Sequence, residues 1–309
     1  MYKKVLIDCD PGIDDALALM LAFHSPEIRV MAVTGVNGNV PLNLVFENIR
    51  KVLALIRPHQ KPLIARGAGR PLKGEPVYAY SFHGKDGLGG AKIEREEEEW
   101  WKIFSGRADD LIPEMARRYP HELTLVATGP LTNLALALRR DPEGMKSLKE
   151  VIVMGGAVRS KGNVTPYAEF NLFVDTLAAR MVFESGLPLT LVPLDVTLQV
   201  LLTPQLMEER VKPLNNSFSQ FAVEATGYES SGHKFRTGEV FHLHDPLAAA
   251  VAIDPDLVKK EKLSIHVETE EGEHLGRTSE SPENPDVDVC LEVDSKRFLE
   301  LFLSRLCSK

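Results

Sequence analysis

Cysteine is scarce in this sequence, with three residues among 309, at Cys9, Cys290 and Cys307. Three widely separated thiols provide neither a disulfide framework nor a zinc cluster. Such low cysteine usage is typical of a reducing compartment, where disulfides do not persist. We therefore expect a cytoplasmic protein.

Long apolar runs are also missing. A transmembrane helix needs about 18 consecutive apolar residues, whereas residues 16–23, among the longest runs here, number eight. Near the N-terminus only residues 5–7 are apolar before Asp8, which is too short for a secretory signal. We expect neither a membrane span nor a cleaved signal segment.

Clustered positive charge is absent as well. The chain has 36 Lys and Arg against 44 Asp and Glu, a formal net charge of −8. General binding to nucleic acid needs grouped cations that neutralise phosphates, so we exclude it. The hydrophobic fraction of 44% and charged fraction of 26% are typical of a globular protein. A chain of this length can bury a sizeable core without covalent staples.

The apolar residues that are present fall into a regular alternation of patterns. Short runs rich in Val, Leu and Ile predict strands, and longer periodic segments between them predict helices. Buried strands that alternate with helices indicate a mainly parallel sheet covered on both faces. With no repeat and no linker-like segment, we predict an α/β fold in one domain, residues 1–309, around a doubly wound central sheet. The expected strands are residues 5–7, 29–33, 123–127, 151–154, 187–194 and 286–293, and the expected helices are residues 16–23, 42–56, 131–138, 175–184 and 295–306.

Polar residues and glycines follow the predicted strands. Residues 8–15, 34–39 and 128–130 are examples, each placed directly after an apolar run. In open α/β sheets, ligands bind at the carboxyl ends of the strands. Glycine there lets the backbone approach a ligand closely. We expect the functional site at this edge of the sheet.

Four aspartates, Asp8, Asp10, Asp14 and Asp15, fall within eight positions. Packing like charges together is costly unless a cation neutralises them or some become protonated. An oxygen-only donor set favours Ca²⁺ or Mg²⁺ over zinc. Helix capping would explain one aspartate at the start of the next helix. It does not explain the pair at the strand end, so we favour a metal site.

Two other motifs compete for this segment. An EF-hand loop beginning at Asp8 would need Glu at its twelfth position, where the chain has Leu19. A haloacid-dehalogenase-type phosphatase places Asp-x-Asp after a strand, as Asp8 and Asp10 do, but such enzymes usually carry Thr or Val where this chain has Gly12. A Mg²⁺ phosphatase that uses Asp8 is the alternative hypothesis.

The segment DCDPGIDDA at residues 8–16 closely resembles the N-terminal signature of the inosine-uridine-preferring nucleoside hydrolases. Further motifs of that family follow in the same order, over about residues 4 to 300. They are GN at 38–39, ATGPLTN at 127–133, VMGG at 153–156, GN at 162–163, AEFN at 168–171 and HDP at 244–246. So many motifs in one order make a chance match improbable.

This resemblance implies both a fold and an activity. The family fold is a single α/β domain with a tightly bound Ca²⁺ at the strand ends. The implied reaction is hydrolysis of the N-glycosidic bond of a small-molecule ribonucleoside, giving free base and ribose, in nucleoside catabolism or salvage. Family members are commonly dimers or tetramers, so the resemblance implies a homodimer or homotetramer.

The resemblance also assigns residues. Three carboxylates and one backbone carbonyl resemble the metal ligands, namely Asp10, Asp15, Asp245 and Thr128. A second set of residues resembles the family's contacts to the ribose. It consists of Asp14, Asn39, Asn163, Glu169 and Asn171, with Met154 beside them. His244 resembles the histidine near the leaving base, and His83, in a Gly-rich loop, resembles a mobile-loop histidine at the pocket mouth.

The chemistry gives these residues roles. We expect water held by the metal to attack the anomeric carbon with inversion, Asp10 to act as general base, and His244 to be the leaving-group acid. His242 is the local rival for that acid. Taken alone, Asp245 followed by Pro246 reads as a helix N-cap, and only its pairing with Asp10 favours a ligand role.

The sequence leaves open the base preference and the alternative of a binding protein without turnover. The choice between purine and pyrimidine bases lies in the loops at residues 82–90 and 224–242, which the sequence does not interpret. A nucleoside- or ribose-binding protein without turnover is a further hypothesis. It would require the loss of a catalytic group, and none of the expected groups is missing.

Overall fold

A computed structural model describes residues 2–93, 99–228, 235 and 238–306. The described residues form a ten-stranded sheet in the order β11-β10-β12-β7-β6-β5-β1-β2-β3-β4. All neighbours from β12 to β4 pair in parallel, and β10 is antiparallel to both β12 and β11. The strands are β1 (Lys3–Cys9), β2 (Ile28–Gly35), β3 (Leu63–Arg66), β4 (Lys102–Arg107), β5 (Leu123–Ala127), β6 (Glu150–Met154), β7 (Leu189–Val192), β10 (Val258–Val267), β11 (Thr278–Glu280) and β12 (Asp286–Val293).

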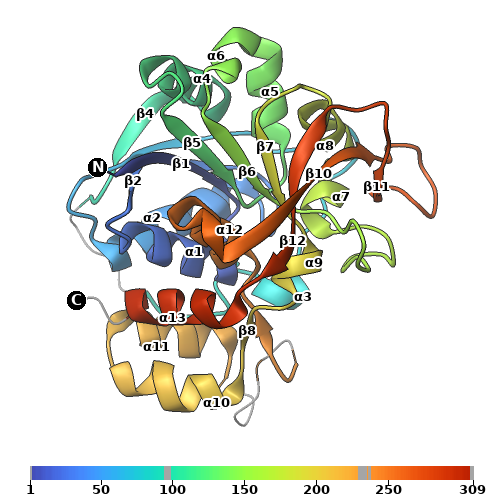
Figure 1. Cartoon of the computed structure of the whole chain (residues 1–309). Coiled ribbons are helices and arrows are strands. Elements are labelled where there is room, and N and C mark those ends of the chain that lie inside the picture. Colours follow the sequence, from blue (N-terminus) through green and yellow to red (C-terminus); the bar gives the residue numbers. More distant parts are fainter. Residues whose placement is uncertain (1, 94–98, 229–234, 236–237, 307–309) are drawn as a thin grey trace.

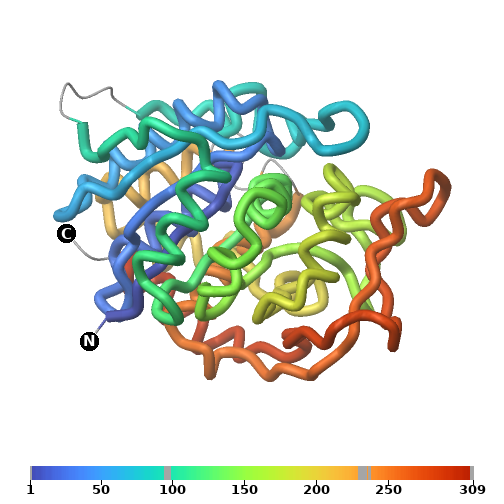
Figure 2. Tube along the Cα trace, turned by 90° about the horizontal axis from the view of Figure 1, so that it is seen from above, coloured from blue at the N-terminus to red at the C-terminus, as the bar shows by residue number. Residues whose placement is uncertain are grey.

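Helices cover both faces of this sheet, as Figure 1 and the perpendicular view of Figure 2 show. One face carries α1 (Ile13–Phe23), α2 (Leu42–Ile56), α11 (Ser217–Thr226), α12 (His244–Ile253) and α13 (Ser295–Leu306). The other carries α4 (Ala108–Arg118), α5 (Thr132–Arg140), α6 (Pro142–Lys146) and α8 (Thr176–Phe183). Two apolar cores separate the sheet from these layers. The predicted fold class, α/β with a mainly parallel, doubly wound sheet, is confirmed.

Short elements complete the chain at the edges of the sheet. They are α3 (Tyr80–His83), α7 (Phe170–Val174), α9 (Leu194–Thr197), α10 (Pro204–Leu206), a π-turn (Met207–Val211), 3₁₀ turns (Lys212–Leu214 and Pro255–Leu257), and the pair β8 (Leu201–Leu202) and β9 (Phe241–His242). None of the helices in the described part of the chain is both long and apolar enough to cross a membrane.

The strand order places the crevice for a ligand. From β1 the chain proceeds outward through β2, β3 and β4, and then returns to place β5 on the other side of β1. Such a reversal of direction opens a crevice at the carboxyl ends of the central strands. The loops after β1, β2, β5 and β6 therefore meet there. Helix α1, buried along almost its whole length, packs against α12 and so brings residues from near the N-terminus together with residues about 230 positions later in the sequence.

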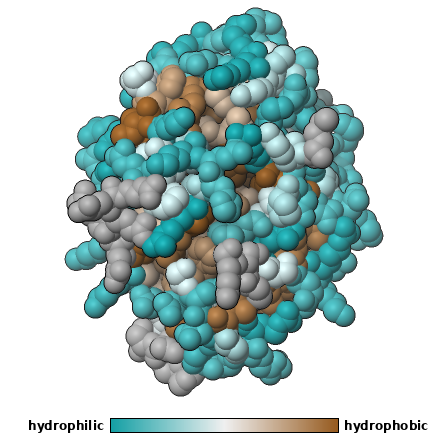
Figure 3. Space-filling view, turned by 90° about the vertical axis from the view of Figure 1, so that its left-hand side faces the viewer, coloured by the Kyte–Doolittle hydropathy of each residue, from teal (hydrophilic) through white to brown (hydrophobic). Residues whose placement is uncertain are grey.

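Polar side chains cover much of the face shown in Figure 3, with smaller apolar patches between them. The edge strand β4 has exposed cations at Lys102 and Arg107. Charged side chains on an edge strand discourage pairing with another chain. These charges therefore disfavour extension of the sheet at this edge.

Candidate active site

Carboxylates from the starts of two helices meet at the crevice. Asp14 and Asp15 stand in the first turn of α1, and Asp245 stands in the first turn of α12. One oxygen from each of the three lies within 4.8 Å of the others, and all three residues are buried. The N-cap of α12 is Leu243, with no side-chain cap bond. Asp245 therefore faces the other carboxylates and does not cap its helix.

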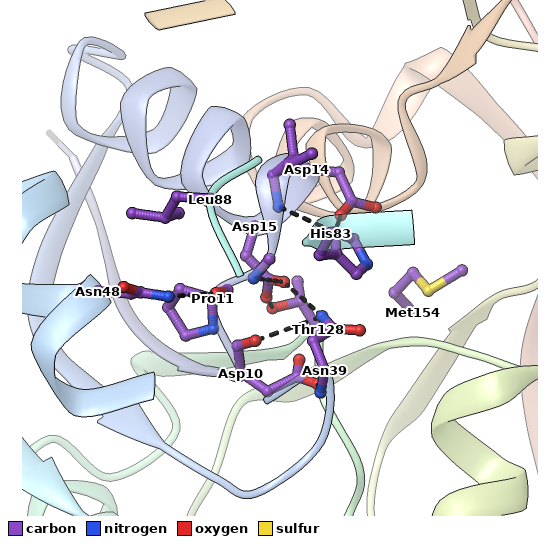
Figure 4. Close-up of polar contacts among 12 residues, drawn as sticks. Asp10, Pro11, Asp14, Asp15, Asn39, Asn48, His83, Leu88, Thr128 and Met154 are labelled. Carbon is purple, nitrogen blue, oxygen red and sulfur yellow. Dashed lines mark hydrogen bonds and ion pairs between the residues drawn. The ribbon is translucent and has the colours of Figure 1, made fainter. Parts of the chain in front are cut away.

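Asp15 is held by donors from three elements. Its Oδ2 accepts from the backbone N–H of Gly12 at 2.9 Å and from Nδ2 of Asn39 at 3.2 Å. Its Oδ1 accepts from the hydroxyl of Thr128 at 2.8 Å. We expected one aspartate to be the cap of a helix starting near Ala16, but α1 begins at Ile13 and its N-cap is Gly12, so Asp15 stands at the third helical position and accepts from the N-cap backbone. Figure 4 shows these side chains converging.

Asp10 lies in the turn between β1 and α1 with one oxygen anchored and the other without a partner. Oδ2 accepts from the backbone N–H of Asn39 at 2.6 Å, whereas Oδ1 is buried and has no hydrogen-bond partner in the described part of the chain. A Cβ on Gly38 would lie 2.0 Å from Oδ2, and one on Gly129 would lie 2.7 Å from Oδ1. Both glycines are needed because the backbone passes so close to this carboxylate.

The electrostatics of the cluster favour a cation. Burial raises the pKa of Asp10, Asp14, Asp15 and Asp245, and repulsion among these carboxylates raises it further for Asp10, Asp14 and Asp245. The pKa of Asp14 rises to about 7. In the described part of the chain, the ion pairs bring no Lys or Arg to the cluster, and only His83 approaches it. A buried set of carboxylates without a counter-charge needs one from outside the protein.

The donors fit a hard divalent cation. Asp10 and Asp14 each keep a buried oxygen without a partner. The carbonyl of Thr128 accepts from Nδ2 of Asn171 at 2.7 Å, which leaves its second lone pair free. Oxygen donors of this kind suit Ca²⁺ or Mg²⁺. We expected Asp10, Asp15 and Asp245 as ligands, but the compact group contains Asp14, expected on the ribose, instead of Asp10.

Asp8 has a different environment from the cluster. It is fully buried, and its Oδ1 accepts from the hydroxyl of Thr34 and from Nδ2 of Asn133. Burial raises its pKa to about 7. Asp8 lies outside the compact carboxylate group, so the geometry gives no support to a phosphatase that uses Asp8 together with a bound Mg²⁺. Sequence reasoning missed Thr34 and Asn133, because only the strand pairing brings them to Asp8.

Three residues predicted to contact substrate gather beside Thr128. Nδ2 of Asn171 also donates to the carbonyl of Met154 at 3.3 Å. The carboxylate of Glu169 caps α7 and accepts three backbone N–H groups, from Gly156, Asn171 and Leu172. Burial raises the pKa of Glu169 to about 7. These bonds fix the segment after β6 against the carbonyl that the metal hypothesis requires.

Asn163 is placed differently from the other predicted contacts. It is exposed, and its Oδ1 accepts from the backbone N–H of Phe170 at 2.9 Å. This bond secures the loop that leads into α7. None of the hydrogen bonds found among the described residues joins Asn163 to the carboxylate cluster.

His83 lies deeper than expected. It ends α3, only 6% of its surface is exposed, and its Nδ1 accepts from the backbone N–H of Ile13 at 3.1 Å. The same nitrogen is 3.9 Å from Oδ1 of Asp14. Burial lowers its pKa to about 3, so the ring is neutral. We expected a mobile histidine at the pocket mouth, but the bond to the start of α1 holds the ring beside the cluster.

His244 begins α12 directly before Asp245. Its Nδ1 is 2.7 Å from the hydroxyl oxygen of Thr197. Burial, together with the nearby His242 and His83, lowers its pKa to about 3. The ring of His242 stacks on it, with centroids 5.3 Å apart and planes 20° apart. The two candidates for leaving-group acid are thus neighbours.

A positioning residue escaped the sequence reading. Asn48, fully buried on α2, donates from Nδ2 to the carbonyls of Pro11 at 3.1 Å and Asp86 at 2.8 Å. It joins the aspartate turn to the loop after α3 (Figure 4). The available signal was an amide on the otherwise apolar face of a helix. Residues 224–242, expected near the base, lie partly outside the described residues.

Comparison with known proteins agrees with this geometry. The family model for "Inosine-uridine preferring nucleoside hydrolase" matches residues 5–300. The chain is 35% identical to the inosine-uridine preferring nucleoside hydrolase of Crithidia fasciculata, over 99% of this chain and 98% of that protein. It is also 35% identical to the pyrimidine-specific ribonucleoside hydrolase RihA of Salmonella gallinarum, over 99% of both chains.

Solved structures give the same result. A plant nucleoside hydrolase superposes with a TM-score of 0.90 at 31% identity, covering 100% of both chains. A purine-preferring ribonucleoside hydrolase from Gardnerella vaginalis gives 0.89 at 32% identity, covering 99% of this chain and 98% of the other. With its carboxylate cluster at the sheet's crevice and matches along its whole length, the chain belongs to the inosine-uridine preferring nucleoside hydrolase family, enzymes that act on N-glycosyl bonds.

Proposed function

We propose that this protein catalyses Ca²⁺-dependent hydrolysis of the N-glycosidic bond of ribonucleosides, releasing free base and ribose. The observation that carries the proposal is the buried group of Asp10, Asp14, Asp15 and Asp245, in which two oxygens have no hydrogen-bond partner among the residues that the structure describes. An uncompensated set of carboxylates in a ligand crevice is costly to maintain unless a cation binds there.

The residues that would hold the cation are Asp10, Asp15 and Asp245, with the carbonyl of Thr128, and Asp14 lies close enough to join them. Ca²⁺ is the preferred ion because it accepts six to eight oxygens in flexible geometry. When bound, it would orient the vicinal hydroxyls of the ribose and lower the pKa of a water molecule.

Asp10 is the proposed general base. Its Oδ2 is fixed by the backbone N–H of Asn39, and its Oδ1 is free to take a proton from the attacking water. A positioned base contributes roughly 10²–10⁴ in rate. Because water attacks the anomeric carbon directly, we expect inversion at that carbon.

The ribose would be held by hydrogen-bonding groups around the cluster. Asp14 can accept from a hydroxyl, and the amide oxygens of Asn39 and Asn171, whose Nδ2 groups are already engaged, can do the same. Glu169 and Asn163 stay predicted ribose contacts, and their side chains also accept backbone N–H groups at the start of α7. A site built for a hydroxyl rejects an analogue without it, since the buried partners are left unpaired.

His244 would stabilise the leaving base. Its ring is neutral, because burial lowers its pKa to about 3, so it offers an N–H donor and not a formal positive charge. A hydrogen bond from this donor disperses the negative charge that develops on the base as the bond to the sugar breaks. The base can then take its proton from water. His83, also neutral, lies beside Asp14 on the same side.

The direct test is release of ribose from uridine and inosine, measured as reducing sugar, with protein dialysed free of metal and then given Ca²⁺. We expect turnover that depends on Ca²⁺. Phosphate released from nucleotides instead would support the phosphatase, and nucleoside binding without turnover would support a binding protein. Intact uridine and inosine in the presence of Ca²⁺ would contradict the proposal.

Base preference needs a panel of nucleosides, because the relatives differ. They include inosine-uridine preferring, pyrimidine-specific and purine-preferring hydrolases. A homodimer or homotetramer, a cytoplasmic location and a role in catabolism or salvage stay predictions.

A further inference from the structure

Thr197 occupies an unusual place for a threonine. It ends α9, the short helix that follows β7, and its side chain is fully buried. Its hydroxyl oxygen lies 2.7 Å from Nδ1 of His244, although 47 residues separate the two in sequence. The backbone N–H of Thr197 bonds to the carbonyl of Pro193, which fixes the helical turn that carries the side chain.

In this hydrogen bond, the hydroxyl of Thr197 is the donor and Nδ1 of His244 is the acceptor. Among the described residues, the hydroxyl of Thr197 makes no other side-chain hydrogen bond. A buried hydroxyl that keeps its hydrogen unpaired loses stability, so that hydrogen needs an acceptor. Nδ1 of His244 is the acceptor in reach, and Thr197 therefore donates to it. An Nδ1 that accepts a hydrogen bond carries no proton, so the ring proton of His244 is on Nε2.

The other edge of the His244 ring is open. Nε2 has no hydrogen-bond partner among the described residues, and the residue is only partly buried. The stacked ring of His242 restricts rotation of the imidazole, and the next residue is Asp245 of the carboxylate cluster. The ring is thus fixed on its Nδ1 edge and at its face, while the Nε2–H is left to a ligand.

We propose that Thr197 is a positioning residue, which selects the Nε2–H tautomer of His244 and aims that donor at the leaving base. The inference rests on the proposed N-ribohydrolase function. It adds to that function a residue whose hydroxyl acts only through His244. Histidine donors in proteins commonly depend on a partner at the second ring nitrogen to set the tautomer.

The first test compares Thr197→Val, which removes the hydroxyl at nearly constant volume, with Thr197→Ser, which keeps it. The matched control is Thr190→Val, because Thr190 is equally buried on β7 and bonds to Glu150, not to the site. Each variant is assayed on inosine and on 4-nitrophenyl riboside, whose leaving group needs no donor.

We expect Thr197→Val to lower kcat for inosine by about tenfold or more, which is less than the roughly 10²–10³ for a deleted transition-state donor because His244 itself remains, and for the nitrophenyl riboside by less than about threefold. Thr197→Ser should recover most of the loss, and Thr190→Val should affect both substrates equally. Equal losses on both substrates in Thr197→Val, or a serine variant as slow as the valine variant, would overturn the proposal.

The second test does not use activity. In protein labelled with ¹⁵N-histidine, the ring nitrogens of His244, assigned with His244→Gln, should show the Nε2–H form, and Thr197→Val should convert it to a mixture. A wild-type ring protonated on Nδ1 would refute the inference without any variant. If the wild type hydrolyses no nucleoside, the proposed function fails, and this spectrum alone then decides the tautomer claim.

Discussion

The free energy of unfolding should fall with rising pH in the metal-free protein, and a cation bound in the carboxylate cluster should remove that fall. In metal-free protein the folded state holds Asp14 at a pKa of about 7, whereas an unfolded aspartate has a value of about 3.9. Between these values the folded state binds more protons, so the free energy of unfolding falls as the pH rises. A bound cation removes the need for those protons, and the loss should disappear.

The size of the change in the free energy of unfolding follows from the raised pKa of Asp14. One group contributes roughly 1.4 kcal/mol per pH unit, so Asp14 alone would cost up to about 4 kcal/mol between pH 4 and pH 7. For a protein of this size that corresponds to a fall in Tm on the order of 10 °C. Asp10 and Asp245, whose pKa values are raised further, act in the same direction.

Other titratable residues also change the stability with pH, and their contribution must be separated from that of the carboxylate cluster. Burial lowers the pKa of His83 and His244 to about 3, so these rings oppose the trend: their stabilisation is lost as the pH falls below about 6.5. Asp141, whose pKa Arg117 lowers to about 2, matters only below about pH 4. Because these contributions are common to both forms, the informative quantity is the difference between them.

The assay is thermal unfolding by circular dichroism at pH 5, 6 and 7, with metal-stripped protein and with Ca²⁺ added. The stabilisation by Ca²⁺ should grow with pH. Asp14→Asn, which removes one repelling charge, should raise the Tm of stripped protein at pH 7 and reduce the gain from Ca²⁺. A gain that is the same at every pH would refute the charge-repulsion reasoning.

Four further predictions follow from the site. Asp10→Asn should lower kcat by about 10²–10⁴ with little change in the circular dichroism spectrum, and a smaller loss in steady-state assays would remove its role as base. Gly38→Ala places a Cβ 2.0 Å from Oδ2 of Asp10, so it should lower kcat at least about tenfold and weaken Ca²⁺ binding in calorimetry. An unchanged kcat and an unchanged Ca²⁺ affinity would show that the backbone of this turn can move to make room for the Cβ. 2′-Deoxyuridine should react up to about 10⁴-fold more slowly than uridine, and equal kcat/KM values would exclude hydroxyl recognition. His244→Ala should slow inosine far more than 4-nitrophenyl riboside, and equal rate losses would remove its leaving-group role.

Local sequence patterns predicted the central elements well. The helices at residues 42–56 and 295–306 and the strands at residues 123–127 and 286–293 have the predicted bounds. In each, the apolar period is regular and turn residues or caps mark the ends. Strands β3, β4 and β10 were not predicted, because they lie toward the sheet edges, where exposed residues dilute the pattern.

In the site, too, the sequence predicted which segments meet, but not how their side chains are directed. The order of the motifs predicted that aspartates from distant segments meet, and Asp15 and Asp245 do. Side-chain direction could not be predicted, since it depends on packing between α1 and α12. This packing brings Asp14 into the compact group, and α3, whose position was also not predicted, brings His83 to the backbone of Ile13. Thr197 and Asn48 were missed for the same reason, because their partners are distant in sequence.

The most direct measurement is diffraction from crystals grown in calcium, with an anomalous difference map. We predict one strong peak, coordinated by carboxylate oxygens of Asp10, Asp15 and Asp245 and by the carbonyl oxygen of Thr128, at distances of about 2.3–2.6 Å. A map without density among these side chains, or with calcium bound elsewhere only, would contradict the metal site and the hydrolytic mechanism built on it.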